Sequence, residues 1–136
     1  MKNLLFIIAL FLSFSFQSCK ETTSNSELIG EIEVISPQQV YDAVHNNDTV
    51  QLVDVRTKKE FIASHLKGAQ NICVTDDDFY EKVKTLDKNK PVYVYCKMGG
   101  RSADAAKKLK KMGFSKVYDM EGGISSWEEK KLKTEK

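Results

Sequence analysis

Residues 93–102 read YVYCKMGGRS and bring three kinds of sequence together. The tyrosines and the valine, with Val92 just before them, favour a β-strand. Cys96 follows at once, then two glycines, an arginine and a serine, and after Ser102 comes a run of helix formers. In open parallel sheets, functional groups collect beyond the carboxyl ends of the strands. A strand that ends on a thiol and turns through glycines into a helix therefore predicts an α/β fold with a reactive site at this turn.

Strand patterns alternate with helix patterns on both sides of this stretch. Short runs of strand formers occupy residues 50–55, 70–74, 92–95 and 116–119. Helix starts are indicated by Ser36-Pro37, by the capping box Thr57-Lys58-Lys59-Glu60 and by Gly122-Gly123, and a further helix is expected over residues 102–112. The alternation predicts a single α/β domain with a small, mainly parallel five-stranded sheet and helices on both faces.

An acidic run, Thr75-Asp76-Asp77-Asp78, has the composition either of a metal loop or of a helix start. A calcium loop of the EF-hand type needs a glycine and a distal glutamate at fixed positions, and neither completes that spacing here. A threonine N-cap followed by acids in the first turn suits a helix that runs to about Leu86, because the helix dipole favours negative charge there. We therefore expect a helix, and we predict no metal and no cofactor.

The length and composition suit one ordinary globular domain. The chain has 136 residues, of which 41% are hydrophobic, enough for a real core. The formal net charge is only +2, from 21 lysines and arginines against 19 acids, and the lysines are spread along the expected helices. No basic block is present, so a nucleic-acid partner is not expected.

The first residues have the features of an export signal. Lys2 precedes an apolar run, residues 4–16, whose length of about 13 residues suits a signal peptide and is shorter than the roughly 20 needed to span a bilayer. The next residues, Phe16-Gln17-Ser18-Cys19, resemble a bacterial lipobox, in which a small residue precedes the cysteine that becomes lipidated. Plain secretion with a free Cys19 is the alternative.

The expected organisation is a signal peptide at residues 1–18, a lipidated Cys19 with a polar tether at residues 19–30, and the folded domain at residues 31–136. By the same resemblance, the lysine after Cys19 favours the outer membrane over the inner one. The protein is thus expected in the cell envelope, at the outer membrane or the periplasmic face rather than in the cytoplasm. Acyl chains such as palmitate would hold it there, since each buried methylene contributes about 0.8 kcal/mol.

The loop after Cys96 has the composition of an anion-binding cradle. Gly99 and Gly100 allow positive φ, so successive backbone N–H groups can turn inward. The helix that follows adds its positive dipole end, and Arg101 adds a fixed charge, as does the lysine after Cys96. Such surroundings lower the pKa of a cysteine from about 8.5 to roughly 3.5–7.5, which makes a nucleophile at neutral pH. The alternative is a small buried residue that ends a core strand.

The folded part resembles the rhodanese-like sulfurtransferase family over nearly all of its length. Six blocks in the family's order carry the resemblance: residues 52–56 (LVDVR) with Glu60-Phe61, residues 65–72 (HLKGAQNI), residues 92–96 (VYVYC) with Gly99 and Arg101-Ser102, Ala105-Ala106 with Leu109, Gly113-Phe114, and Gly122-Gly123-Ile124 with Trp127. The resemblance implies a rhodanese-like α/β fold and a monomeric, single-domain sulfurtransferase.

By this resemblance, Cys96 is the catalytic nucleophile of a ping-pong sulfur transfer. Its thiolate would take the outer sulfur of a small anionic donor such as thiosulfate, release sulfite, and pass the sulfur from a persulfide to a thiol or to cyanide. The implied substrate-binding residues are Lys97, Met98, Gly99, Gly100, Arg101 and Ser102, with Arg56 as a further candidate. For Arg56, a structural ion pair with Glu60 or another acid is the open alternative. Asp54 is expected to support the loop or Arg56 through hydrogen bonds.

Two other functions are weighed against this one. A non-catalytic or carrier module of the same family would hold persulfide sulfur for a partner protein, and an intact Cys96 argues only against an inert domain. Cysteine phosphatases on a related fold use C-x5-R, whose larger cradle suits a phosphoryl group. Here four residues separate Cys96 from Arg101, and this shorter C-x4-R loop favours sulfur transfer over phosphatase or arsenate reductase activity.

Cys73 and His65 are further candidates with structural alternatives. Cys73 stands where the family commonly has proline, and is expected to be a small buried residue or else a resolving thiol. In the family's strand order it lies on a strand that does not neighbour that of Cys96, so a disulfide, which needs Cα atoms within about 7 Å, is not expected. His65 follows Ser64, which replaces the family's usual glycine, and is expected to stabilise a turn rather than act as a base.

Overall fold

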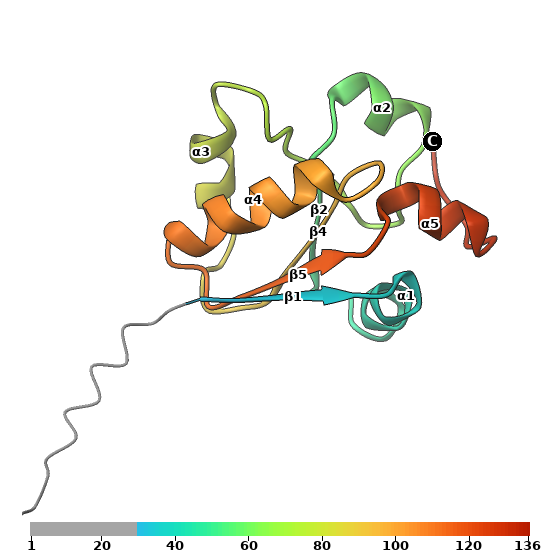
Figure 1. The fold of residues 1–136 in the computed structure, drawn as a ribbon, viewed down its shortest axis with the longest axis horizontal. Coiled ribbons are helices and arrows are strands. Elements are labelled where there is room, and N and C mark those ends of the chain that lie inside the picture. Colours follow the sequence, from blue (N-terminus) through green and yellow to red (C-terminus); the bar gives the residue numbers. More distant parts are fainter. Residues whose placement is uncertain (1–29) are drawn as a thin grey trace, which may run out of the picture.

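The computed structural model describes residues 30–136, so the predicted signal peptide and Cys19 lie outside the described residues. Within them, no helix is both long and apolar enough for a membrane span. The elements follow one another as β1 (Glu31–Ile35), α1 (Pro37–Asn46), β2 (Gln51–Asp54), α2 (Lys58–Ala63), β3 (Gln70–Asn71), α3 (Phe79–Lys82), the 3-10 helix η1 (Val83–Thr85), β4 (Val92–Tyr95), α4 (Gly100–Lys111), β5 (Lys116–Met120) and α5 (Gly123–Glu129) (Figure 1).

The five strands form one parallel sheet in the order β1-β5-β4-β2-β3. This confirms the predicted sheet. The central strand is β4, where Val94 pairs with Val53 of β2 on one side and with Asp119 of β5 on the other. Because all strands run the same way, the carboxyl ends of β2, β4 and β5 meet at one edge of the sheet. The edge therefore gathers the residues that follow these three strands.

Side-chain alternation along β4 divides the core between the two faces of the sheet. Val92, Val94 and Cys96 belong to a cluster with residues of α3, η1 and α4, whereas Tyr95 belongs to a second cluster with residues of α1 and α5. In Figure 1, α3 and α4 lie on one side of the strands and α1 on the other. Trp127 of α5 is the largest side chain that is fully buried. Helices thus cover both faces, as predicted.

Two predicted helix starts are capped as the sequence indicates. The Ser36 hydroxyl accepts the N–H of Gln39 at 3.3 Å, and the Gln39 side chain accepts the N–H of Ser36 at 2.9 Å. Thr57 and Glu60 exchange the equivalent bonds at 3.4 Å and 3.1 Å. These capping boxes satisfy N–H groups that the first helical turn leaves without partners, which fixes where α1 and α2 begin.

Two predicted elements have other boundaries in the structure, and one strand was not predicted. The helix expected from Thr75 begins only at Phe79, because backbone turns occupy the residues between and the Thr75 hydroxyl lies 3.2 Å from the sulfur of Cys73 instead of capping. The strand expected over residues 70–74 is confined to β3. The edge strand β1 has no counterpart in the prediction, since exposed residues interrupt the alternation along it.

Candidate active site

Cys96 follows β4 directly at the carboxyl edge of the sheet and is 1% exposed. The backbone N–H of Gly99 donates a hydrogen bond to its sulfur at 3.0 Å. Gly99 has φ of +111° and serves as the N-cap of α4. The positive φ bends the loop so that its amides turn back toward the thiol, a conformation that glycine adopts without steric cost. The predicted turn of amides around Cys96 is therefore present.

Gly100 does not share this conformation. It lies outside the glycines with positive φ and is already the first residue of α4, so the helix begins two residues before the predicted Ser102. Of the two glycines that the sequence allows to adopt positive φ, only Gly99 does so. One left-handed residue is enough, because the helical geometry that starts at Gly100 directs the following N–H groups toward the thiol.

The pKa of Cys96 is lowered below its usual value. Burial alone would raise the pKa, because it disfavours the thiolate. Hydrogen bonds from the hydroxyl and N–H of Ser102 and from the N–H groups of Gly99 and Met98 outweigh burial. These neutral donors are the leading cause of the lower pKa, ahead of the charge of Arg101, which also interacts with the Cys96 thiolate.

Arg101 is paired with a carboxylate. Its Nη1 and Nη2 donate to the two oxygens of Glu60, each at 2.8 Å, and about a third of each side chain is exposed. The Arg101 guanidinium, with help from the Thr57 donors, lowers the pKa of Glu60 to about 2. Arg101 therefore fastens the end of the loop to α2, and its charge is largely offset, which differs from the free cation that the sequence predicts.

Arg56 lies in a buried ion pair. Its Nε and Nη2 donate to the Asp54 carboxylate at 2.6–3.0 Å, and Nη2 also donates to the carbonyl of Ser64 at 2.6 Å. Asp54 is fully buried, and Arg56 is 5% exposed with its guanidinium over the ring of Tyr95. Arg56 thus forms the ion pair with an acid that was the open alternative, with Asp54 as its partner, and its part in substrate binding stays a prediction. The expected support of Arg56 by Asp54 is confirmed.

The remaining predicted residues separate into two groups. Lys97 and Met98 are exposed at the mouth of the loop, Met98 by 74%. His65 lies elsewhere: its Nδ1 is 3.0 Å from the carbonyl of Phe61 and its ring stacks on the Phe61 ring, the structural role expected of it. Cys73 is buried and free, as is Cys96, and β2 separates the strands that precede them, as predicted.

Two features of the site have no counterpart in the prediction. The N–H groups of Ile124 and Ser125 donate to the carbonyls of Cys96 and Lys97 at 2.9 Å and 3.0 Å, so α5 holds the loop from the side opposite its amides. A Cβ on Gly123 would come within 2.5 Å of those same carbonyls. The sequence signal was the pair Gly122-Gly123, which indicates a close backbone approach as well as a turn.

Asp119 is the second such feature. It is 5% exposed, and its Oδ1 has no hydrogen-bond partner among the described residues. Burial raises its pKa, while a hydrogen bond from Ser102 acts in the opposite direction. The signal is its spacing from Val117: alternate residues of a strand share a face, so an acid two positions after a core valine is itself directed into the core.

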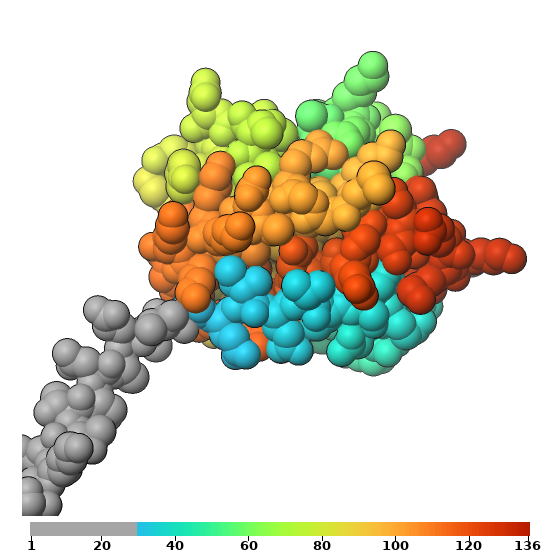
Figure 2. Space-filling view, viewed as in Figure 1, coloured from blue at the N-terminus to red at the C-terminus, as the bar shows by residue number. Residues whose placement is uncertain are grey.

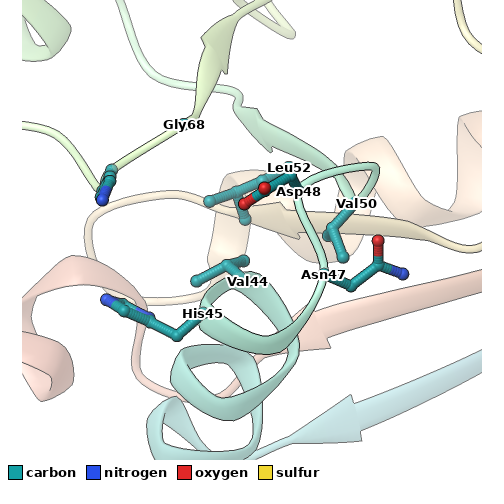
Figure 3. A pocket seen from close by; sticks show the side chains of 8 residues that line it. Val44, His45, Asn47, Asp48, Val50, Leu52 and Gly68 are labelled. Carbon is teal, nitrogen blue, oxygen red and sulfur yellow. The ribbon is translucent and has the colours of Figure 1, made fainter.

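A separate pocket lies away from this loop. It has a volume of about 150 Å³ and lies beside the end of α1, where Val44, His45, Asn47, Asp48, Val50, Leu52, Lys67 and Gly68 line it (Figure 3). None of the residues from Cys96 to Ser102 contributes to it. The loop after Cys96 leads into α4, and in the space-filling view α4 borders the green segment that contains α2 and α5 in red (Figure 2). The candidate active site therefore lies among α2, α4 and α5.

Known proteins share this sequence and fold. The sequence model of the Rhodanese-like domain matches residues 36–130. The thiosulfate sulfurtransferase GlpE of Glaesserella parasuis is 34% identical over 101 residues, covering 74% of this chain and 91% of that protein. The adenylyltransferase and sulfurtransferase UBA4 of Meyerozyma guilliermondii is 37% identical over 112 residues, which cover 73% of this chain. The chain spans only 26% of the length of UBA4.

A solved structure agrees with the sequence matches. The rhodanese-related protein from Thermoplasma volcanium is 30% identical and superposes with a TM-score of 0.66. The match covers 76% of this chain and 97% of that one. The likeness therefore extends over nearly all of that protein.

Proposed function

The chain belongs to the rhodanese-like domain family, and from this premise we propose that it is a sulfurtransferase that carries sulfur on Cys96. The proposed donor is a small anion with an outer sulfane sulfur, such as thiosulfate, and the proposed acceptor is a thiol or cyanide. GlpE, which matches over most of its length, is a thiosulfate sulfurtransferase, and this relative favours thiosulfate as the donor to test first.

One observation carries the proposal: the sulfur of Cys96 is the acceptor of N–H donors at the start of α4, with Gly99 at 3.0 Å. The same donors that lower the thiol pKa would stabilise a persulfide anion in the same place, since both species carry charge on sulfur. The loop has four residues between Cys96 and Arg101, a length that favours sulfur transfer over the phosphoryl chemistry of the longer C-x5-R loop.

In the first half-reaction, the Cys96 thiolate attacks the outer sulfur of thiosulfate. A bond forms between the two sulfurs, the sulfur–sulfur bond of the donor breaks, and sulfite leaves with the electron pair. In the second, the acceptor attacks the outer sulfur of the persulfide, and Cys96 leaves as a thiolate. Atoms and electrons balance in both steps with no added oxidant or reductant.

Residues at the mouth of the loop would receive the donor. Lys97 and Met98 are exposed there, and the Lys97 ammonium supplies positive charge for an anion. Arg101 contributes less charge than a free arginine because Glu60 holds both of its terminal nitrogens. We therefore assign donor attraction mainly to Lys97 and to the loop amides, and the anchoring of the loop to Arg101.

Mass spectrometry of the protein after treatment with thiosulfate tests the proposal. A gain of one sulfur atom, mapped to the peptide that contains Cys96 and removed by cyanide with release of thiocyanate, is the expected result. The Cys96→Ser variant is the matched control and should gain none. A persulfide that forms but never turns over would instead identify a carrier module. Absence of any adduct at high thiosulfate concentration would exclude sulfur chemistry at Cys96.

We also propose that the protein is anchored in the cell envelope through lipidated Cys19. The support is the lipobox-like Phe16-Gln17-Ser18-Cys19 after an apolar run, in residues outside the described part of the chain. Detergent phase partition of the protein from a bacterial host tests this. The wild type should enter the detergent phase and Cys19→Ala the aqueous phase. Equal partition of the two would refute the anchor.

A further inference from the structure

A second, larger hollow adjoins the pocket at the end of α1. Its volume is about 660 Å³, within the roughly 300–1,000 Å³ of small-molecule sites. His45 and Lys67 line both hollows, so the two meet at these side chains; Figure 3 shows His45 beside the smaller one. None of the residues from Cys96 to Ser102 lines the larger hollow. It is therefore separate from the candidate active site.

The larger hollow, which we call the basic pocket, is lined by four basic side chains: His45, Lys67, Lys131 and Lys133. Glu135 is the one acid that the described residues contribute to its lining. The three lysines form no ion pair with any acid of residues 30–136. Their charges are therefore available to a ligand. The ring of Tyr41 and the side chain of Leu132 add apolar surface to the same pocket.

His45 can offer one of its ring nitrogens to a ligand. Its Nδ1 lies 2.9 Å from the carbonyl of Tyr41, and because a carbonyl only accepts, this nitrogen carries the proton. Its Nε2 has no hydrogen-bond partner among the described residues. The imidazole stacks on the ring of Tyr41, with 3.8 Å between the ring centroids. Stacking and the Nδ1 hydrogen bond together hold the ring in place at the edge of the basic pocket.

The C-terminal wall of the basic pocket is fastened to the rest of the domain. Glu135 exchanges two backbone hydrogen bonds with His65, at 2.9 Å and 2.7 Å, and the Trp127 indole donates to the carbonyl of Lys133 at 3.1 Å. His65 lies two residues before Lys67. The backbone positions of the pocket lysines are thus fixed relative to one another before a ligand binds, which reduces the entropy that binding would cost.

Lys131 has an unusual backbone conformation. Its φ is +58°, and among residues 30–136 no other residue except glycine has positive φ. Its N–H donates to the carbonyl of Glu128 at 2.9 Å, and the N–H of Leu132 donates to that of Trp127 at 3.3 Å, which is the Schellman ending of a helix. Glycine is usual at this position because a side chain there is strained. Strained residues cluster at ligand sites, and the side chain kept here lines the basic pocket.

We propose that the basic pocket binds a small organic phosphate. The phosphate group would accept from the ammonium groups of Lys67, Lys131 and Lys133, since lysine binds phosphate as a point charge. The surplus of basic groups over one acid favours a ligand with more than one negative charge. A flat or apolar part of the ligand would lie against Tyr41 and Leu132. The proposal goes beyond the proposed function, because it involves neither Cys96 nor sulfur.

Phenyl phosphate is the probe, with inorganic phosphate and phenol as its two halves. Amide chemical shifts of the full chain, recorded by NMR during titration, locate the binding. We expect saturable shifts at Lys67 and residues 131–135, none at residues 97–102, and a Kd below about 1 mM. Phenyl phosphate should bind more tightly than either half, because the pocket contacts both.

Two triple variants test the role of charge. Replacing Lys67, Lys131 and Lys133 by glutamine should weaken binding of phenyl phosphate roughly tenfold or more, since each exposed charge pair contributes about two- to fivefold. Replacing Lys107, Lys110 and Lys111 of α4 by glutamine changes the net charge equally and is the matched control. It should leave the affinity within about twofold of the wild type at physiological salt, where distant charges are screened.

Lys131→Gly separates binding from structure. Glycine adopts positive φ without strain, so the Tm without ligand should rise by a few degrees, whereas the affinity for phenyl phosphate should fall. Shifts confined to residues 97–102, binding that does not saturate, equal affinities of the two triple variants, or an unchanged affinity in Lys131→Gly would each overturn the proposal. Sulfur loading of Cys96 from thiosulfate should be normal in the pocket variants, so the proposed function and the basic pocket are tested independently.

Discussion

The guanidinium of Arg101 and the carboxylate of Glu60 meet end to end, with both nitrogen–oxygen distances at 2.8 Å. Glu60 also accepts hydrogen bonds from the N–H and the hydroxyl of Thr57 at the start of α2. One carboxylate therefore completes a helix cap and holds the far end of the loop around Cys96. The position of α2 and the shape of the loop are coupled through this side chain.

We predict that Glu60→Gln lowers the KM for thiosulfate. Glutamine retains the capping box with Thr57, but the charge of Arg101 is no longer offset. The fall should be roughly two- to fivefold at low ionic strength, the size of a partly exposed ion pair of 0.2–1 kcal/mol, and should disappear at high salt. Arg101→Ala, which leaves the Glu60 charge alone beside the loop, should raise the KM. If the wild type, Glu60→Gln and Arg101→Ala all have the same KM, this ion pair has no part in donor recognition.

The same pair predicts a pH dependence of stability. Folding lowers the pKa of Glu60 from 4.5 to about 2, so its stabilising effect is complete above pH 4.5 and is lost as the pH falls from there toward 2. Urea unfolding of the wild type and of Glu60→Gln at several pH values measures this. The stability advantage of the wild type should shrink between pH 5 and pH 2. A constant difference across that interval would contradict the assigned pairing.

The sequence predicts those parts of the molecule that depend on neighbouring residues. The capping boxes at Ser36 and Thr57 lie within four residues, and the order of strands and helices follows from local patterns. The partner of Arg101 is 41 residues away, and no local pattern identifies it. Asp54 and Arg56 are two residues apart, yet their pairing depends on the direction that each side chain takes where β2 ends, which the sequence alone does not determine. The position of Asp119 next to β4 could not be predicted, because it depends on the register of β5 against β4, which only the folded sheet defines.

Arg56→Met is predicted to reduce stability without affecting donor binding. The substitution leaves the Asp54 carboxylate buried without its partner, and loss of one member of a buried ion pair costs about 3–5 kcal/mol. The free energy of unfolding should fall by that amount, and the double variant Asp54→Asn with Arg56→Met should recover part of it. The KM for thiosulfate, measured at a temperature where the variant is folded, should be that of the wild type. A KM higher than that of the wild type would instead support a role for Arg56 in substrate binding.

Cys96→Ser is predicted to abolish sulfur transfer while the fold is retained. The hydroxyl is smaller than the thiol and can accept the same N–H of Gly99, so the unfolding free energy should change by less than about 2 kcal/mol. Circular dichroism on heating measures the fold, and thiocyanate release from thiosulfate and cyanide measures transfer. Cys73→Ser is the matched control, because it exchanges a second buried thiol whose sulfur contacts Thr75 rather than the loop. Activity that survives in Cys96→Ser would refute the proposed nucleophile.

Gly123→Ala is predicted to displace the loop that follows Cys96, because the added Cβ would collide with the backbone of that loop. An added Cβ would lie 2.5 Å from the carbonyl oxygens of Cys96 and Lys97, which the N–H groups of Ile124 and Ser125 now hold. Gly68→Ala is the control, since Gly68 also has positive φ but has no atom within 4 Å of the added Cβ.

The two variants share the conformational cost of an alanine at positive φ, about 1–2 kcal/mol. Gly123→Ala should lose roughly a further 1–3 kcal/mol because the crowded loop must move. It should also raise the pKa of the Cys96 thiol, measured by the pH dependence of alkylation, because the donors at Gly99 and Ser102 no longer converge on the sulfur. If both variants lose the same stability and leave the thiol pKa unchanged, the contact between α5 and the loop does not position Cys96.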